Sequence, residues 1–249
     1  CLASYVRARA DARLAARRPP RVSPEEACTL PGAWGTAHEV LRRGARPAAA
    51  CTFVLHAAAG GVGLATMEYI HWVGARLVAT AGRPAKHAVV RRLGVSVSCS
   101  SRNAAALGFG LPRMLATRRA RGVCNSLADD FVPASLAALT EGGSFAEIGK
   151  RRAWSNGRAR VASSAATYTL LDLALDTSTS PRWAGALFTT LSARLHAAVV
   201  HGLPWVRFEV ADVRAAFELV RRGGHVGKVV VGSPYATVVQ GALLGPDEQ

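Results

Sequence analysis

The segment around residue 60 constrains the fold of this chain more than any other. Residues 52–55 form an apolar run that reads as a buried strand, and residues 64–70 form a second one that reads as a helix. The segment between them, residues 56–63, has the sequence HAAAGGVG. A strand, a glycine-rich turn and a helix in this order are typical of the corner of a Rossmann unit that holds a pyrophosphate, because the backbone there must approach the ligand closely. We therefore predict a cofactor-binding turn, with a plain tight turn as the alternative. Its residues are Ala57, Gly60, Gly61, Val62 and Gly63.

Further strands and helices alternate along the rest of the chain. We expect short strands over residues 76–81, 95–99, 122–127, 144–149, 205–210 and 228–231. We expect helices over residues 33–41, 86–93, 131–139, 182–199 and 213–221, whereas residues 102–121 are either helical or loose. Ser23 is a candidate N-cap for a helix that starts at Pro24. This alternation predicts an α/β fold with a doubly wound parallel sheet, followed by a loose tail over residues 232–249.

Length and composition limit the class of protein. A chain of 249 residues, half of them hydrophobic, can form one large domain or two small ones. No apolar run reaches the roughly 18 residues that cross a bilayer, and no apolar core follows the basic N-terminus, so we expect neither a membrane span nor a signal peptide. The first residue is Cys1, which suggests a piece of a longer protein. The five cysteines form no closely spaced pair, so we expect reduced thiols, no metal site and an intracellular protein, in the cytoplasm or an organelle.

The net charge of +15 raises the question of nucleic-acid binding. The basic residues are spread along the whole chain and no row of aromatic residues accompanies them, so we favour a solvated basic surface without specific nucleic-acid binding. Arginine outnumbers lysine by 28 to 3. A buried lysine can lose its proton and an arginine cannot, so the three lysines are candidates for roles that need an ammonium group. They are Lys86, Lys150 and Lys228.

The end of the second predicted strand indicates which dinucleotide binds. In a Rossmann unit that binds NAD, this strand usually ends in a carboxylate that holds the ribose hydroxyls. Here residues 80–86 read TAGRPAK, with no acid but with two cations, Arg83 and Lys86. These cations suit a 2′-phosphate, so the sequence favours NADPH over NAD. The missing carboxylate also argues against a methyltransferase, which usually needs one for a ribose. The alternative is an ordinary basic turn that opens a helix.

Five short motifs carry a resemblance to a known family. They are Ala57-x-x-Gly60-x-x-Gly63, Ala79-Thr80-Ala81, Asn125-Ser126-Leu127, Phe145-x-Glu147-Ile148-Gly149-Lys150 and His225-Val226-Gly227-Lys228-Val229-Val230. In this order they resemble the enoyl reductase domains of polyketide synthases, in the zinc-independent branch of the medium-chain dehydrogenase/reductase superfamily, to which related quinone oxidoreductases also belong. The resemblance runs from about residue 2 to residue 231 and includes ACTLP at residues 27–31.

The resemblance also implies how the chain is divided. We expect the end of a GroES-like substrate domain and a connector over residues 1–31, and an NADPH-binding Rossmann domain over residues 32–202. Residues 203–231 would return to the GroES-like domain, and residues 232–249 would form the tail. Remnants of a GroES-like β domain would then lie at both ends of the doubly wound sheet.

An activity and a set of site residues follow from the resemblance. The implied reaction is the NADPH-dependent reduction of an enoyl thioester on an acyl carrier protein, in polyketide or fatty-acid synthesis. Hydride reaches the β-carbon, and a proton then reaches the α-carbon. The family's proposed proton-transfer pair corresponds to Lys150 and Asp172, and a cation held by a carboxylate suits a developing enolate charge. The alternative for this pair is a structural salt bridge. The motifs further place Asn125, Gly149 and Lys228 at the cofactor, and the implied partners include other synthase domains.

The chain departs from the family pattern in two places. It contains only the end of the N-terminal substrate domain, and none of its four tyrosines corresponds to the tyrosine often proposed as proton donor. The strand before Asn125 is expected to be short, which affects the sheet near the nicotinamide. Two other functions therefore stay open: a stand-alone quinone or enone oxidoreductase, and an inactive NADPH-binding structural module of a large synthase. The histidines at 56, 71 and 87 read as strand-end or helix-surface residues rather than ligands.

Overall fold

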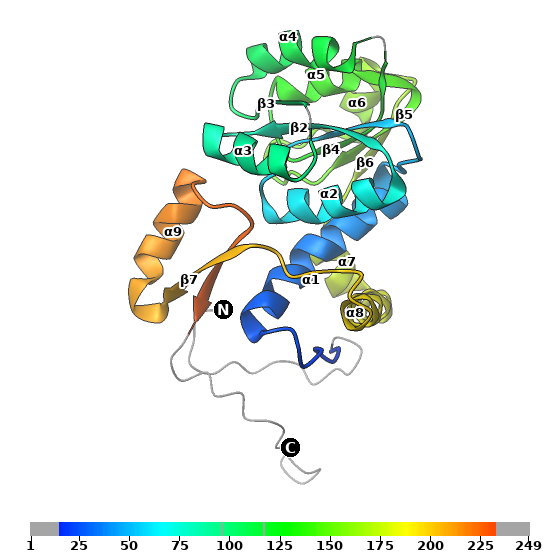
Figure 1. Ribbon diagram of the computed structural model, residues 1–249. Coiled ribbons are helices and arrows are strands. Elements are labelled where there is room, and N and C mark those ends of the chain that lie inside the picture. The colour runs from blue at the N-terminus through cyan, green and yellow to red at the C-terminus, as the bar shows by residue number, and fades with distance from the viewer. Residues whose placement is uncertain (1–14, 96, 117, 233–249) are drawn as a thin grey trace.

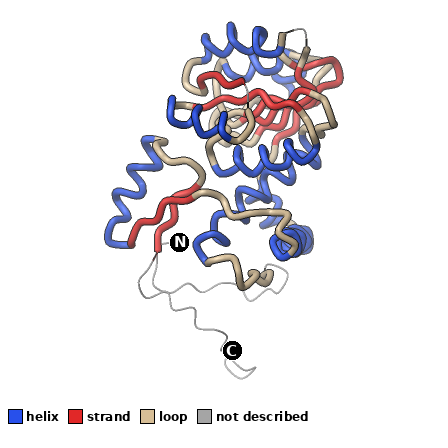
Figure 2. The backbone as a smooth tube through the Cα atoms, in the orientation of Figure 1, coloured by secondary structure: helices blue, strands red, loops and turns tan. Residues whose placement is uncertain are grey.

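A six-stranded parallel sheet forms the centre of the computed structural model, which describes residues 15–95, 97–116 and 118–232 (Figure 1, Figure 2). The strands are β1 (Thr52–Leu55), β2 (Arg76–Ala81), β3 (Val97–Ser100), β4 (Ala120–Asn125), β5 (Leu139–Glu147) and β6 (Thr167–Leu170). Their order across the sheet is β3-β2-β1-β4-β5-β6, so the chain reverses its direction of travel between β1 and β4. The predicted doubly wound parallel sheet is confirmed. Ligands of such sheets bind at the carboxyl ends of the strands beside the reversal.

Helices cover both faces of the sheet because successive side chains of a strand point to opposite sides. Phe53 and Leu55 of β1 pack in one buried cluster, and Val54 between them packs in the other. The helices of the first cluster are α1 (Pro24–Glu39), α2 (Gly61–Val73), α3 (Pro84–Arg92) and α8 (Pro181–His196). The second cluster contains α4 (Ala104–Leu115) and α5 (Phe131–Ala137). Two shorter helices, α6 (Asn156–Ala162) and α7 (Leu173–Thr179), flank β6.

Helix α1 begins where the sequence predicts but is longer than expected. Ser23 caps it: the Ser23 hydroxyl accepts the N–H of Glu26 (3.1 Å), and the Glu26 carboxylate accepts the N–H of Ser23 (2.8 Å). The helix continues through Pro31 and passes into a π-helical turn, Val40–Gly44, so the separate helix expected over residues 33–41 is wrong. Since α1 crosses residue 31, the expected border between the first two domains falls inside a helix, and that division stays a prediction.

Strand β4 starts two residues earlier than predicted, at Ala120, and ends at Asn125. Five of its six residues precede Asn125 and it pairs with both β1 and β5, so the expectation of a short strand before Asn125 is wrong. Basic residues obscure the start of the strand in the sequence. In the structure, Arg119 donates to backbone carbonyls at residues 137 and 139, and Arg121 donates to the carbonyl of Gly142. These arginines therefore tie the start of β4 to the segment that leads into β5.

A second, two-stranded parallel sheet lies beside the main one (Figure 1). It consists of β7 (Trp205–Glu209) and β8 (Lys228–Gly232), joined by a 3-10 turn (Val210–Asp212) and by α9 (Val213–Arg222). Phe217 and Val220 of α9 are 62% and 49% exposed, so the helix shows apolar surface to solvent. An exposed apolar stripe of this kind suits contact with a further element. It agrees with the predicted return to a second domain, which stays a prediction. From residue 233 onward, the expected tail lies outside the described residues.

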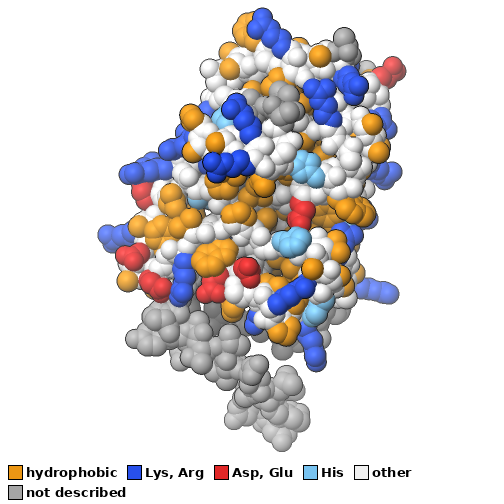
Figure 3. All heavy atoms as spheres, viewed as in Figure 1, with side chains coloured by type: hydrophobic (Ala, Val, Ile, Leu, Met, Phe, Trp, Pro, Cys, Tyr) orange, Lys and Arg blue, Asp and Glu red, His pale blue; other side chains and the backbone are white. Residues whose placement is uncertain are grey.

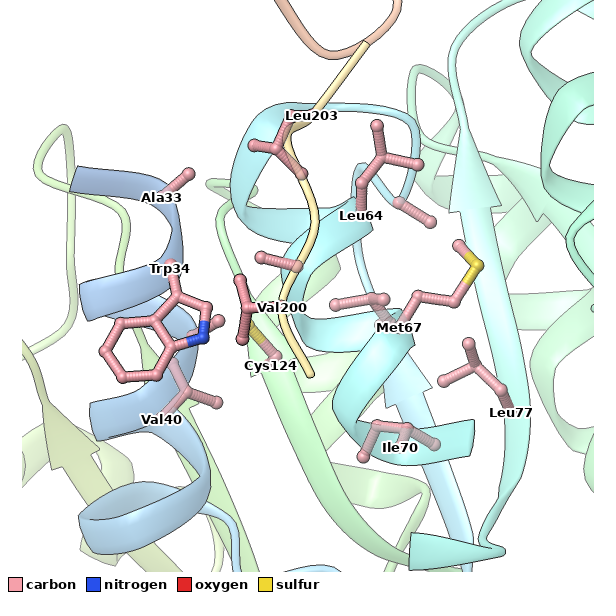
Figure 4. Packing of buried hydrophobic residues seen from close by; sticks show 14 of the residues in the cluster. Ala33, Trp34, Val40, Leu64, Met67, Ile70, Leu77, Cys124, Val200 and Leu203 are labelled. Carbon is pink, nitrogen blue, oxygen red and sulfur yellow. The ribbon is translucent and has the colours of Figure 1, made fainter. Parts of the chain in front are cut away.

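The first buried cluster fixes α2 in place. Trp34 of α1 and Val40 of the π-helical turn face Leu64 and Ile70 of α2, and Val200 from the segment after α8 lies between the two helices (Figure 4). Trp34 is 1% exposed and Ile70 is 0% exposed. Each large apolar side chain buried in this way contributes about 1.5–3 kcal/mol. The N-terminus of α2, where the glycine turn ends, is therefore held by the core.

The surface shows no concentration of basic charge on the face drawn in Figure 3, where lysine and arginine side chains are scattered. Among the described residues, no helix has the length and apolar character needed to span a membrane. Within the same ranges, no three His, Cys, Asp or Glu side chains gather as metal ligands would. Four cysteines in these ranges are free thiols: Cys28, Cys51, Cys99 and Cys124.

Candidate functional site

The glycine turn contains a strained residue that β2 holds in place. Ala57 has a φ of 50°, in the left-handed region that costs an L-residue roughly 1–2 kcal/mol. The Ala57 N–H donates to Oγ1 of Thr80 (3.0 Å), and the Ala58 N–H donates to the carbonyl of Thr80 (2.9 Å). The Gly60 N–H closes the turn on the Ala57 carbonyl (3.0 Å). Thr80 thus anchors both residues that lead into the predicted phosphate-binding turn.

The N-terminus of α2 is open to an anion. Gly60 is the N-cap residue, and no side chain caps the helix. The unpaired N–H groups and the helix dipole there favour negative charge. A Cβ atom on Gly63 would lie 2.5 Å from the carbonyl oxygen of Ala58, so α2 packs against the turn at a distance that only glycine allows. Gly63 therefore fixes α2 closely against the turn, with the open helix N-terminus directed at the space above it.

A cavity of about 280 Å³ lies over this turn, at the carboxyl ends of β1 and β4. Its opposite wall comes from the segment before β8, where the Gly227 N–H donates to the carbonyl of Ala59 (2.9 Å). Gly227 has a φ of 71°, and a Cβ there would overlap the carbonyl oxygen of Pro204 at 1.9 Å. Lys228 also lines the cavity, and a Cβ on Gly61 would lie 2.7 Å from its Cε. The predicted cofactor residues of the turn and Lys228 are thus brought together.

Cations gather beside the cavity at the ends of β2 and β3. The guanidinium groups of Arg83 and Arg102 both donate to the carbonyl of Arg222 at the end of α9 (3.0 and 3.2 Å). Burial, and then repulsion from Arg102 and Arg83, lowers the pKa of Lys86. Burial and repulsion from Lys86 likewise lower the pKa of His225, whose Nδ1 is buried with no hydrogen-bond partner. Mutual repulsion of this kind is relieved by a bound anion.

A buried carboxylate holds the ends of β4 and β5 together. Glu147, which is 1% exposed, accepts the Nδ2 group of Asn125 (2.7 Å) and the N–H of Gly149 (2.6 Å). Burial raises the pKa of Glu147 to about 7, and these two hydrogen bonds partly oppose the shift. Asn125 also donates to the carbonyl of Leu127 and accepts its N–H. The amide group of Asn125 therefore organises the loop after β4.

The predicted pair of Lys150 and Asp172 is formed. Lys150 Nζ lies 2.8 Å from Oδ1 of Asp172, and this hydrogen bond is the main cause that lowers the pKa of the carboxyl group. The same Oδ1 accepts the N–H groups of Ala174 and Leu175, so Asp172 is also the N-cap of α7. The two side chains are 63% and 37% exposed. An ion pair this exposed contributes about 0–1 kcal/mol to stability. The Lys150–Asp172 pair therefore adds little to the stability of the fold.

Sequence reasoning missed several residues of this site. Arg102 follows β3, and its position after the strand next to β2 is the signal that could have found it. His225 and Glu147 lie inside motifs already noted, but a motif does not show which side chain is buried. Three of the predicted site residues do not line the cavity: Asn125, Lys150 and Asp172. Ile148, which directly precedes Gly149, does line it. The roles predicted for the individual site residues stay predictions.

Known proteins with similar sequences or structures include dehydrogenases and enoyl reductases. Residues 113–231 match the family described as zinc-binding dehydrogenase. Erythronolide synthase EryA2 of Saccharopolyspora erythraea is 33% identical over 238 residues, which cover 94% of this chain and 6% of the synthase. The crystal structure of the CurK enoyl reductase is 32% identical, with a TM-score of 0.80 over 88% of this chain and 65% of that one. The nucleotide-binding subdomain of the enoylreductase domain of PpsC from Mycobacterium tuberculosis is 26% identical, with a TM-score of 0.62 over 70% of this chain and 97% of the subdomain.

The parallel sheet and the glycine turn after β1 define a Rossmann-type α/β domain. Within that class, the chain is similar to the enoyl reductase domains of polyketide synthases, which confirms the resemblance found in its motifs. The match spans only 6% of the synthase EryA2 and just under two thirds (65%) of the CurK enoyl reductase.

Proposed function

We propose that this chain is the NADPH-binding part of an enoyl reductase that reduces the α,β double bond of an enoyl thioester in polyketide or fatty-acid synthesis. The observation that carries the proposal is the cavity over the glycine turn, with cations grouped at its side. The names of the relatives support the same activity, since they include a CurK enoyl reductase and synthases of polyketides.

The residues present fit NADPH. The turn and the open end of α2, which no side chain caps, would hold the pyrophosphate. Arg83, Lys86 and Arg102 would hold the 2′-phosphate, because their repulsion is relieved by an added dianion. Lys228 would extend over the phosphates from the far wall.

The chemistry is divided between the cofactor and two side chains. When bound, NADPH supplies the hydride that adds to the β-carbon of the thioester. The Lys150 ammonium would stabilise the negative charge that develops on the thioester oxygen, and it would hold a proton for the α-carbon. Asp172 would orient Lys150 through the 2.8 Å contact and keep it protonated. Glu147 would hold Gly149 and thereby fix the backbone from which Lys150 extends.

The proposed partners follow from the relatives. Those relatives are multidomain polyketide synthases, so we propose that the chain works beside other synthase domains and receives its substrate from an acyl carrier protein. The four free cysteines of the described residues support the reducing, intracellular location that we expected, in the cytoplasm or an organelle.

Two measurements test the proposed function. The 249-residue chain should bind NADPH more tightly than NADH in a fluorescence titration. With a crotonyl thioester, the loss of NADPH absorbance should report turnover. Lys150→Ala combined with Asp172→Ala should abolish that turnover while the Kd for NADPH stays the same. Lys86→Ala is the matched control, since it should weaken NADPH binding and leave the chemical step intact.

The other outcomes identify the two alternative functions. NADPH binding without any turnover would favour a structural module of a synthase. Turnover of a quinone without turnover of the thioester would favour a stand-alone oxidoreductase. Failure to bind NADPH would overturn the proposal.

A further inference from the structure

A line of buried hydrogen bonds leads from the glycine turn through the sheet to helix α5, and His56 lies in its middle. The Ala57 N–H donates to Oγ1 of Thr80 (3.0 Å), which lies 3.2 Å from Nδ1 of His56. On the other side of the ring, Nε2 of His56 lies 2.8 Å from Oγ of Ser135. The side chain of Ser135 donates in turn to the carbonyl of Phe131 (2.7 Å). His56 is 2% exposed, and Thr80 and Ser135 are fully buried.

The donors and acceptors of this line fix the form of the imidazole ring. Ser135 gives its only hydroxyl hydrogen to the carbonyl of Phe131, so its oxygen must accept the hydrogen of Nε2. The oxygen of Thr80 already accepts the N–H of Ala57, so the Thr80 hydroxyl hydrogen is available for Nδ1 of His56. The ring is then neutral, with its hydrogen on Nε2. Burial lowers the pKa of His56 to about 4, which agrees with a neutral ring at physiological pH.

We propose that His56 is a positioning residue of the cofactor site, which orients the Thr80 hydroxyl so that the strained Ala57 keeps its left-handed conformation. A neutral imidazole suits this place because it presents an acceptor and a donor at opposite ends of one rigid ring. The edge of Phe131 meets the ring at a centroid distance of 6.5 Å and an angle of 73°, which fixes the plane of the imidazole. Helix α5 is thereby connected to the turn on the opposite side of the sheet. The inference rests on the proposed binding of NADPH to that turn.

Two substitutions at Thr80 test this inference. Thr80→Val keeps the shape of the side chain but removes the hydroxyl, so both Ala57 and His56 lose a partner. We expect the Kd and the KM for NADPH to rise by about tenfold, as for a buried donor left unpaired, while kcat stays unchanged. Thr80→Ser restores the hydroxyl and should bring Kd back to within about twofold of the wild-type value. A purely structural role would instead lower Tm and leave Kd unchanged.

Matched controls separate positioning from general loss of stability. Leu107→Ala opens the second core cluster in α4, away from the turn, and should lower Tm without changing Kd. His201→Gln replaces an exposed histidine that pairs with Glu68, and it should change neither. If Thr80→Val fails to fold, Ser135→Ala takes its place, because it removes the acceptor of Nε2 at the far end of the line. An unchanged Kd in the folded variant would overturn the inference.

A second readout does not depend on NADPH. Nitrogen-15 NMR of the imidazole should show a neutral His56 with its hydrogen on Nε2, and no titration between about pH 5 and pH 8. A hydrogen on Nδ1, or a titration in that range, would overturn the inference even if NADPH binds. A wild-type chain with the expected His56 spectrum but no NADPH binding would contradict the proposed function and leave the hydrogen-bond line in place.

Discussion

Asp129 and Arg152 are both non-glycine residues in the left-handed conformation, and they form an ion pair with each other. Their φ angles are 58° and 55°, and Nη1 of Arg152 lies 3.0 and 3.2 Å from the two carboxylate oxygens of Asp129. Asp129 lies in the loop after β4, and Arg152 lies two residues after Lys150 in the loop after β5. Two strained loops at the carboxyl edge of the sheet are therefore joined directly beside the proposed proton-transfer pair.

This strain predicts an unusual order of stability among variants of Arg152. Arg152→Ala removes the ion pair and keeps a left-handed L-residue, whereas Arg152→Gly removes the pair and relieves the strain. We expect the glycine variant to be more stable than the alanine variant by about 1 kcal/mol in urea denaturation. In most loops the flexible glycine would be the less stable of the two. An alanine variant as stable as the glycine variant would show that the left-handed conformation is not strained.

The packing of α2 against the turn predicts a severe effect at Gly63. Gly63→Ala places a Cβ 2.5 Å from the backbone oxygen of Ala58, which no side-chain movement can relieve. We expect a loss of about 1–3 kcal/mol in the free energy of unfolding, together with loss of NADPH binding. Gly32→Ala in α1 is the matched control, because nothing lies within 4 Å of its Cβ. That control should gain about 0.5–1 kcal/mol from its higher helix propensity, and an equal loss in both variants would contradict the prediction.

The buried Glu147 predicts a dependence of stability on pH. The pKa is 4.5 in the unfolded chain and about 7 in the folded one, so between these values the folded chain binds more protons. Stability from this group is therefore complete below pH 4.5 and decreases as the pH rises towards 7, by roughly 3 kcal/mol. The Cys124 thiol and the Tyr168 phenol do not titrate in this window, because their ordinary pKa values lie above it and burial raises both further.

Glu147→Gln isolates this effect. The glutamine does not ionise. The free energy of unfolding of the variant should therefore increase relative to that of the wild type as the pH increases from 4.5 to 7. Denaturation of both proteins at several pH values measures the difference. A difference that does not change with pH would show that Glu147 ionises normally in the folded chain.

The cation cluster predicts the choice between NADPH and NADH. Arg83→Ala combined with Lys86→Ala should weaken NADPH binding by about 100-fold and leave NADH binding nearly unchanged, because only NADPH carries the extra phosphate. Arg91→Ala is the control, since Arg91 lies in the last turn of the same helix, α3. The double variant should also show a weaker dependence of the NADPH Kd on salt concentration. Equal losses for both dinucleotides would place the cluster at the pyrophosphate instead.

Much of the fold could be predicted because its signals are local. The four buried residues of β1 and the glycine turn after them carry their own periodicity and turn chemistry, and β2 is observed with the predicted bounds. The predictions were wrong where distant contacts outweigh local signals. The start of β4 is basic in sequence, but Arg119 and Arg121 donate to backbone carbonyls between residue 137 and Gly142, at the end of α5 and in the neighbouring strand β5. Helix α1 continues through Pro31 because its buried face packs on α2 and α8.

The site divides in the same way. Arg83 and Lys86 can be proposed from a single turn, because the end of the second strand has a known place in a Rossmann unit, and their role stays a prediction. Arg102 is harder to predict, because it comes close to Arg83 only when β2 pairs with β3 and when both arginines donate to the carbonyl of Arg222. The buried hydrogen bonds of His56 join the turn after β1 to Thr80 of β2 and to Ser135 of α5. These residues lie far apart in the sequence, so no local pattern predicts their contact.

The far wall of the cavity also has a consequence for how the protein is made. All six strands of the main sheet are complete at Leu170, whereas His225, Gly227 and Lys228 close the cavity from near the other end of the chain. A nascent chain on the ribosome can therefore assemble its sheet before it can enclose a dinucleotide. Translation that stops before Gly227 would leave the proposed cofactor site without its far wall, and so without the stabilisation that a bound ligand would give.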